Sequence, residues 1–183
     1  MSRLPRVIAH RGLSARAPEN TLAAFRAAAG AGVPWVECDV QLTADGHAVL
    51  LHDETLDRTT DGTGRLADTP LAGLRGLDAG GWFDAAFAGE SIPALSEALD
   101  LLAALGLGVN LEIKSGPGRG PEAARAVLSE LGIPSDPTDE DRRRLASWLA
   151  IEATASSSSR SSTSSVNIPT WSPISSLATV AYP

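Results

Sequence analysis

The sequence predicts an α/β fold in which parallel strands alternate with helices. Val7–Ala9 is a short apolar run typical of a buried strand, and Leu22, Phe25 and Ala29 then recur at helical spacing. A second strand begins at Trp35. Because strands joined by a crossover helix run in the same direction, this order predicts two adjacent parallel strands.

Start and stop signals bound the predicted helix between these strands. Asn20 or Thr21 can cap its first turn, and Gly30 or Gly32 can end it. Apolar residues at helical spacing predict two further helices, Ser96–Leu105 and Pro121–Leu131.

The stretch WVECDVQLTADGHAVLLHD predicts a hairpin that carries acidic groups. Glu37 and Asp39 alternate with apolar residues, so they project from one face of a strand, roughly 6.6 Å apart along it. Asp45-Gly46 is a tight-turn signal, and the chain then returns to His52 beside the carboxylates. Two such carboxylates repel unless a cation or a shared proton lies between them. A half-exposed hairpin with ordinary surface acids is the alternative.

The sequence VNLEIK, Val109–Lys114, predicts a strand with a polar face. Asn110, Glu112 and Lys114 face one way, and Lys114 is the only lysine in the chain. Three polar side chains on a buried strand need a ligand, a metal or one another. A structural ion pair between Glu112 and Lys114 is the alternative interpretation.

Composition limits the classes of partner. The 183 residues are 43% hydrophobic, enough for a core, and carry a net charge of −7. This charge argues against general attraction to nucleic acid or an anionic membrane. The single cysteine, Cys38, excludes an internal disulfide and is expected to be a buried packing thiol. Neither a signal peptide nor a membrane span is predicted, so a cytoplasmic location is expected.

Polar residues thus stand at comparable positions on three predicted strands, with a histidine returning from the hairpin: His10, Arg11, Glu37, Asp39, Glu112, Lys114 and His52. Three carboxylates without a thiolate suit a hard cation such as Ca²⁺ or Mg²⁺. An arginine fork and a lysine can bind phosphate oxygens, and histidines exchange protons near neutral pH. This set matches the demands of phosphodiester cleavage.

The motifs HRG, PENT, ExD, DGHAVLLHDETLDRTTDGTG, GGWF…GESIP and NLEIK occur in this order. Together they closely resemble the bacterial, cytoplasmic type of the glycerophosphodiester phosphodiesterase family over about residues 6–131. The resemblance implies a TIM barrel related to phosphoinositide-specific phospholipase C. It also implies hydrolysis of glycerophosphodiesters to an alcohol and glycerol 3-phosphate.

The resemblance also implies roles for individual residues. The implied metal ligands are Glu37, Asp39 and Glu112, the catalytic pair His10 and His52, and the phosphate contacts Arg11 and Lys114. We expect His10 to act as the base and His52 as the acid, with a substrate hydroxyl or a water as nucleophile. Glu19, in PENT, has a supporting role, residues 54–93 match the family's insertion, and His47 is expected to be exposed and idle.

Length predicts an incomplete barrel, because an eight-stranded barrel takes about 250 residues. Residues 1–132 are expected to supply about three barrel strands, and residues 133–153 a helical segment with a capped amphipathic helix over Thr138–Glu152. Residues 154–183 are Ser-rich and expected to be disordered. The strand bearing Glu112 would then be an open edge, through which the chain could self-associate.

Other functions stay open on this basis. The chain could be an inactive remnant that binds metal or phosphate, or an interaction module that recruits a partner through its tail and open edge. A sphingomyelinase-D-like activity shares the HR and ExD pattern, but the acidic character and the long insertion disfavour it.

Overall fold

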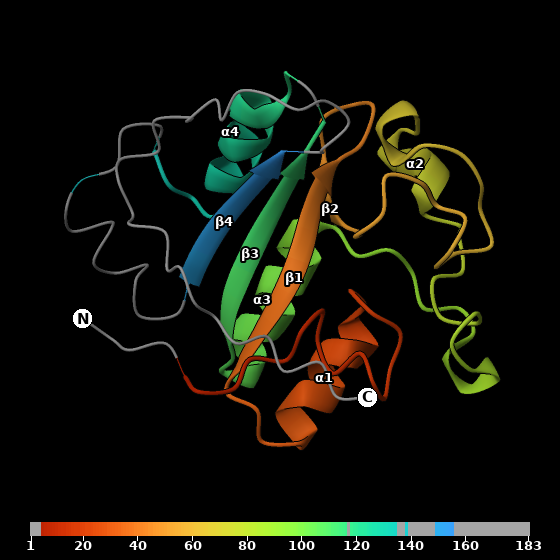
Figure 1. Cartoon of the computed structure of the whole chain (residues 1–183), viewed down its shortest axis with the longest axis vertical. Coiled ribbons are helices and arrows are strands. Elements are labelled where there is room, and N and C mark those ends of the chain that lie inside the picture. The colour runs from red at the N-terminus through yellow and green to blue at the C-terminus, as the bar shows by residue number, and fades with distance from the viewer. Residues whose placement is uncertain (1–4, 117, 135–137, 139–148, 156–183) are drawn as a thin grey trace.

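A four-stranded sheet forms the centre of the computed structural model, which describes residues 5–116, 118–134, 138 and 149–155. The strands are β1 (Trp35–Leu42), β2 (Ala48–Leu50), β3 (Gly108–Ser115) and β4 (Leu149–Ala155), in the spatial order β2-β1-β3-β4. β1, β3 and β4 are parallel, whereas β2 is antiparallel to β1 (Figure 1). The parallel strands are those of an incomplete barrel, and β2 is the return strand of a hairpin.

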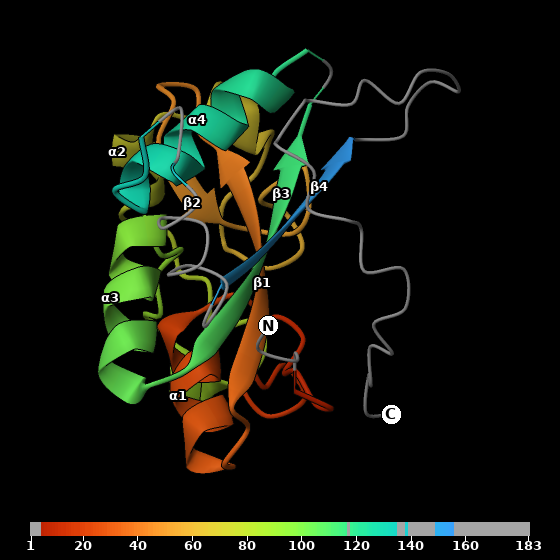
Figure 2. The same ribbon diagram turned by 90° about the vertical axis from the view of Figure 1, so that its left-hand side faces the viewer.

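Three helices cover one face of this sheet, as Figure 2 shows: α1 (Leu22–Gly30), α3 (Leu95–Leu105) and α4 (Gly120–Glu130). The predicted alternation along β1 is confirmed. Val36, Cys38 and Val40 are at most 1% exposed and belong to one core with Phe25 and Leu95. The other face of β1 is therefore left for its polar side chains.

Local signals account for the position of α1. Thr21 is its N-cap, and the Thr21 hydroxyl accepts a hydrogen bond from the backbone N–H of Ala24. The helix ends at Gly30, as predicted. A parallel bridge between Ala9 and Val36 closes this strand-helix-strand unit. The predicted strand Val7–Ala9 is wrong in extent, however, because only Ala9 pairs and Val7 is 50% exposed.

The predicted hairpin is confirmed. Gly46 has φ +83°, a left-handed conformation that glycine adopts without strain, and Val40 to Leu42 then pair with Ala48 to Leu50. The Gln41 side-chain amide contacts the backbone carbonyls of Leu51, His52 and Asp53, at 2.7, 3.1 and 2.8 Å. These bonds fix the path of the chain where it leaves the sheet.

Residues 54–93 form an excursion with a small core of its own. It contains α2 (Leu71–Leu74) and two 3₁₀ turns, Leu66–Asp68 and Ala85–Phe87, and lies beyond β2 in Figure 1. Leu56, Leu66, Leu74 and Ile92 pack there against Val49 and Leu51. Leu50, between those two residues, instead belongs to the main core. β2 thus packs against both apolar clusters.

Two expectations for the later part of the chain are corrected by β4. The predicted helix Thr138–Glu152 is wrong at its end, because Leu149–Ala155 pairs in parallel with β3, Glu112 opposite Glu152. β3, which bears Glu112, is consequently not an edge strand. Residues 139–148 and 156–183, with the rest of that helix and nearly all of the predicted disordered tail, lie outside the described residues. None of the described helices is long and apolar enough to cross a bilayer.

Candidate active site

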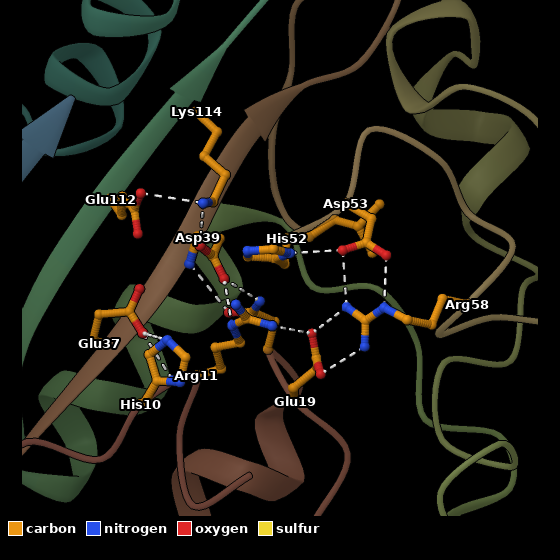
Figure 3. Close-up of polar contacts among 12 residues, drawn as sticks. His10, Arg11, Glu19, Glu37, Asp39, His52, Asp53, Arg58, Glu112 and Lys114 are labelled. Atoms are coloured by element: carbon orange, nitrogen blue, oxygen red, sulfur yellow. Dashed lines mark hydrogen bonds and ion pairs between the residues drawn. The ribbon is translucent and has the colours of Figure 1, made fainter. Parts of the chain in front are cut away.

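Three carboxylates meet at the polar face of the sheet. Glu37 and Asp39 come from β1, and Glu112 comes from β3, where it stands opposite Asp39 in the parallel register. Each offers one oxygen, and these oxygens lie within 4.8 Å of one another (Figure 3). The sequence therefore predicted correctly which acidic residues converge.

The acidic cluster suits a cation. Glu37 is 8% exposed and Asp39 fully buried. Glu37 Oε1 and Asp39 Oδ1 accept no hydrogen bond from the described residues. Burial, reinforced by the negative charge of Asp39, raises the pKa of Glu37 to about 8. A buried oxygen without a hydrogen bond, such as Glu37 Oε1, is costly, and a hard divalent cation would satisfy it, so the set of carboxylates fits Ca²⁺ or Mg²⁺.

Both predicted phosphate-binding cations lie against this cluster. Arg11 Nε is 3.3 Å from Asp39 Oδ2, and Lys114 Nζ is 3.3 Å from Asp39 Oδ1 and 3.1 Å from Glu112 Oε1. Arg11 has φ +56°, and its backbone N–H donates to Glu37 Oε2 at 2.9 Å. An arginine in this uncommon conformation is held by its surroundings, which here include the acidic cluster.

The two predicted catalytic histidines approach from different segments. His10 Nε2 lies 3.7 Å from Glu37 Oε2, and burial, with the charge of Arg11, lowers the pKa of His10. His52 follows the hairpin, and its Nδ1 lies 2.6 Å from Asp53 Oδ1 (Figure 3). The Nε2 atom of His52 is therefore the nitrogen left for proton exchange. His47 has a side chain 55% exposed near the turn, in agreement with the expectation that it is exposed.

Asn20 is a site residue that the sequence analysis treated only as a possible cap. It is 2% exposed, its side-chain amide donates to Asp39 Oδ2 at 2.8 Å, and its side-chain carbonyl accepts from the Asp39 backbone N–H at 3.1 Å. It also has φ +57°. The signal in the sequence was the position of Asn20 in PENT, beside Glu19.

Asp53 and Arg58 were also missed. The Arg58 guanidinium donates to both oxygens of Asp53 and to both oxygens of Glu19, and Glu19 Oε1 accepts from Arg11 Nη1 at 2.9 Å. Burial alone would raise the pKa of Glu19, but the bonds from Arg58 and the charge of Arg11 hold it below its ordinary value. Both missed residues stand in the motif HDETLDR, but residue spacing alone gave no reason to pair them.

Parallel strands backed by helices, with clustered carboxylates, two cations and two histidines at the opposite face, define the class of fold. This is the TIM barrel of the phosphodiesterases, here as an incomplete barrel.

The particular family follows from comparison with known proteins. The model of the glycerophosphoryl diester phosphodiesterase family matches residues 10–131, and the chain belongs to this family. It is 54% identical over 110 residues to a glycerophosphodiester phosphodiesterase of Caldanaerobacter subterraneus, an alignment that covers 60% of this chain and 45% of the relative. It is 44% identical over 125 residues to human glycerophosphodiester phosphodiesterase 1, an alignment that covers 67% of this chain and 38% of the relative.

Solved structures show the same relationship. A phosphodiesterase from Oleispira antarctica, in complex with the product sn-glycerol-3-phosphate, has a TM-score of 0.72 and 43% identity over 82% of this chain and 57% of that one. A glycerophosphodiester phosphodiesterase from Agrobacterium tumefaciens has a TM-score of 0.62 and 39% identity over 77% of this chain and 62% of that one. The chain therefore spans less than half the length of these two curated relatives and up to about three fifths of these solved structures.

Proposed function

We propose that this chain hydrolyses glycerophosphodiesters to an alcohol and glycerol 3-phosphate with the help of Ca²⁺ or Mg²⁺. The observation that supports this proposal most is the cluster of Glu37, Asp39 and Glu112, in which Glu37 Oε1 is buried and accepts no hydrogen bond from the described residues. Arg11 and Lys114 both contact Asp39 in this cluster. The Oleispira relative, which holds sn-glycerol-3-phosphate, supports the same substrate class. A cytoplasmic role in lipid and glycerol metabolism belongs to this proposal.

The metal would be held by Glu37, Asp39 and Glu112. When bound, a divalent cation offsets the negative charge that develops on the phosphate oxygens. Arg11 and Lys114 already contact Asp39, so they can reach a phosphate beside these carboxylates. Arg11 would bind two phosphate oxygens in its planar fork, and Lys114 would add a point charge.

The histidines would move the protons. His10, whose pKa burial and Arg11 lower, is the candidate base, because a larger fraction of it is neutral at pH 7. It would take a proton from the substrate's glycerol hydroxyl or from a water. His52, its Nδ1 engaged with Asp53, would donate a proton from Nε2 to the leaving alcohol. Each such transfer is worth about 10²–10⁴ in rate.

Release of glycerol 3-phosphate from glycerophosphocholine tests the activity. The purified chain is assayed with Ca²⁺, with Mg²⁺ and with EDTA, beside Glu37→Ala and the matched control His47→Ala. We expect metal-dependent turnover in the wild type and in His47→Ala, and none in Glu37→Ala. Absence of turnover from folded wild-type protein would refute the proposal.

The leaving group tests the acid role of His52. A nitrophenolate leaves without protonation, whereas choline and ethanolamine alkoxides need a proton. His52→Ala should therefore lose activity on choline or ethanolamine esters and retain it on a nitrophenyl ester. Equal loss on both substrates would contradict the assignment of His52 as the acid.

A second candidate is binding of metal or phosphate without turnover, or a role as an interaction module. The observation that favours it is the edge of the sheet, since among the described residues no strand pairs with the outer side of β4. Such an edge can recruit another strand, including that of a second copy. A molar mass that rises with concentration in light scattering, together with metal binding but no product, would favour this candidate over the enzyme.

A further inference from the structure

The two sides of the candidate site are joined by one residue of the excursion. Arg58 donates from Nε and Nη2 to Asp53, at 2.6 and 2.9 Å, and from Nη1 and Nη2 to Glu19, at 2.9 and 2.8 Å. Figure 3 shows its guanidinium between the two carboxylates. Each carboxylate also contacts a predicted site residue: Asp53 contacts His52, and Glu19 contacts Arg11. A continuous polar chain thus runs from His52 to Arg11 through Arg58.

The backbone that carries Arg58 is held by the core of the excursion. Leu56 is 2% exposed within that core, and the Thr60 backbone N–H and hydroxyl both donate to the Leu56 carbonyl, at 3.1 and 2.7 Å. Thr59 is 4% exposed. A packed turn therefore places Arg58, so its position depends on the folding of the excursion.

An ordinary surface ion pair is the simplest alternative. The Arg58 side chain is 44% exposed, and isolated exposed pairs contribute little to stability. The geometry differs from such a pair, because a planar fork engages two oxygens of each of two carboxylates. Arg58 also separates Asp53 from Glu19, which as like charges would repel each other.

The two carboxylates depend on Arg58 to different degrees. Glu19 is 13% exposed and keeps the Arg11 guanidinium if Arg58 is removed. The Asp53 side chain is 28% exposed, and its side-chain bonds in the described structure go to Arg58 and His52. Loss of Arg58 would therefore free Asp53 to turn toward water, so the effect would fall on His52.

We propose that Arg58 is a positioning residue of the excursion: it holds Asp53 against His52 Nδ1, and so fixes the tautomer and direction of the His52 ring. A carboxylate that accepts from Nδ1–H leaves Nε2 directed at the reaction. Proton transfer by His52 then requires the docked excursion, although Arg58 itself does not contact the substrate. The catalytic part of this inference rests on the proposed function, whereas the tautomer part does not.

The tautomer is measured by long-range ¹H–¹⁵N correlation NMR at about pH 8.5, where histidines of ordinary pKa are neutral. The chain has three histidines, and His10→Gln and His47→Gln assign the signals. We expect the Nδ1–H form for His52 in the wild type and a mixture with the Nε2–H form in Arg58→Gln. The matched control is Arg75→Gln, which removes an exposed ion pair between the same excursion and α3, Arg75 with Glu97 at 2.7 Å. It should leave His52 unchanged.

Kinetics supply the second readout. On glycerophosphocholine, Arg58→Gln should lower kcat about 10- to 100-fold with KM nearly unchanged, since the loss falls on ring orientation and not on phosphate binding. The decrease should shrink on a nitrophenyl ester. Arg58→Lys keeps the charge but not the fork, so it should resemble Arg58→Gln in both readouts.

The outcomes separate the two proposals. A wild-type His52 tautomer in folded Arg58→Gln, or full rescue by Arg58→Lys, would overturn the positioning role. Absence of turnover in the wild type would refute the proposed function, and the NMR comparison would still decide the role of Arg58.

Discussion

The metal-free protein should lose stability as the pH rises, because its folded state holds a proton on Glu37. A salt-bridged acid has the opposite effect on stability. The pKa of Glu37 is about 8 in the folded chain, against an ordinary value of 4.5. Between these pH values the folded state holds a proton that the unfolded state has released, so stability falls as pH increases. The stabilisation is complete below pH 4.5 and lost as the pH passes 8. At about 1.4 kcal/mol per pH unit, the loss is at most about 5 kcal/mol.

The assay is urea unfolding in EDTA at intervals from pH 5 to pH 8.5, with Glu37→Gln in parallel. Glutamine imitates the protonated acid, so the variant should lack this slope, and the difference between the two curves removes the contribution of every other group. Wild type and variant should be similar near pH 5 and diverge by several kcal/mol near pH 8. Parallel curves over the whole range would refute the reasoning.

A divalent cation should reverse the effect at high pH. Metal binding requires the deprotonated carboxylate, so added Ca²⁺ or Mg²⁺ should stabilise the wild type most near pH 8. At a concentration 100 times the Kd the gain is about 2.7 kcal/mol. Glu37→Gln should gain less, because it offers a neutral amide oxygen. An equal gain in both proteins would show that the cation binds elsewhere.

Three further predictions concern residues around the site. Asn20→Ala should cost about 3–5 kcal/mol of unfolding free energy, because the Asp39 backbone N–H loses its acceptor, Asp39 Oδ2 loses one donor, and alanine is placed at φ +57°. Asn20→Gly should cost about 1 kcal/mol less in urea unfolding, and the reverse order would contradict this account. Gly12→Ala should lower Tm far more than Gly32→Ala. Both glycines have positive φ, but an added Cβ at Gly12 would meet α1 atoms at 2.6 Å, whereas one at Gly32 would meet nothing within 4 Å. Equal shifts in Tm would be inconsistent with this contact. Wild-type stability should fall on acidification below about pH 4, because the Arg58 hydrogen bonds hold the pKa of Asp53 below its ordinary value. In pH-dependent unfolding, Arg58→Gln should reduce this loss of stability in acid, and an unchanged loss would contradict the role given to Arg58.

The sequence predicted the convergence of the acidic side chains, because the period of a strand determines which residues share a face. Glu37 and Asp39 lie at strand period between buried residues, and Glu112 repeats the pattern on the next parallel strand, so their meeting followed from register alone. The hairpin return to His52 followed from the turn signal at Asp45-Gly46. The resemblance then supplied roles that spacing could not.

What the sequence did not predict depends on contacts across the fold. Arg58 meets Glu19 from 39 positions away, and Asn20 meets Asp39 across a helix and a loop. The end of the predicted helix Thr138–Glu152 failed for a related reason. Leu145, Trp148 and Leu149 have the helical spacing of apolar residues, but the side of β3 away from β1 offers backbone donors and acceptors that a strand satisfies.

The packing of β2 and the residue after it against two apolar cores limits which insertions and deletions this fold can accept. Val49 and Leu51 pack into one core and Leu50 into the other, so shifting the β1–β2 pairing by one position would place the wrong side chains in both cores at once. The segment 81–89 contributes no residue to the smaller core, so it can change length without disturbing the pairing of β2. Evolution can therefore remodel that outer segment of the excursion, whereas the short segment Ala48–Leu51 tolerates neither insertion nor deletion.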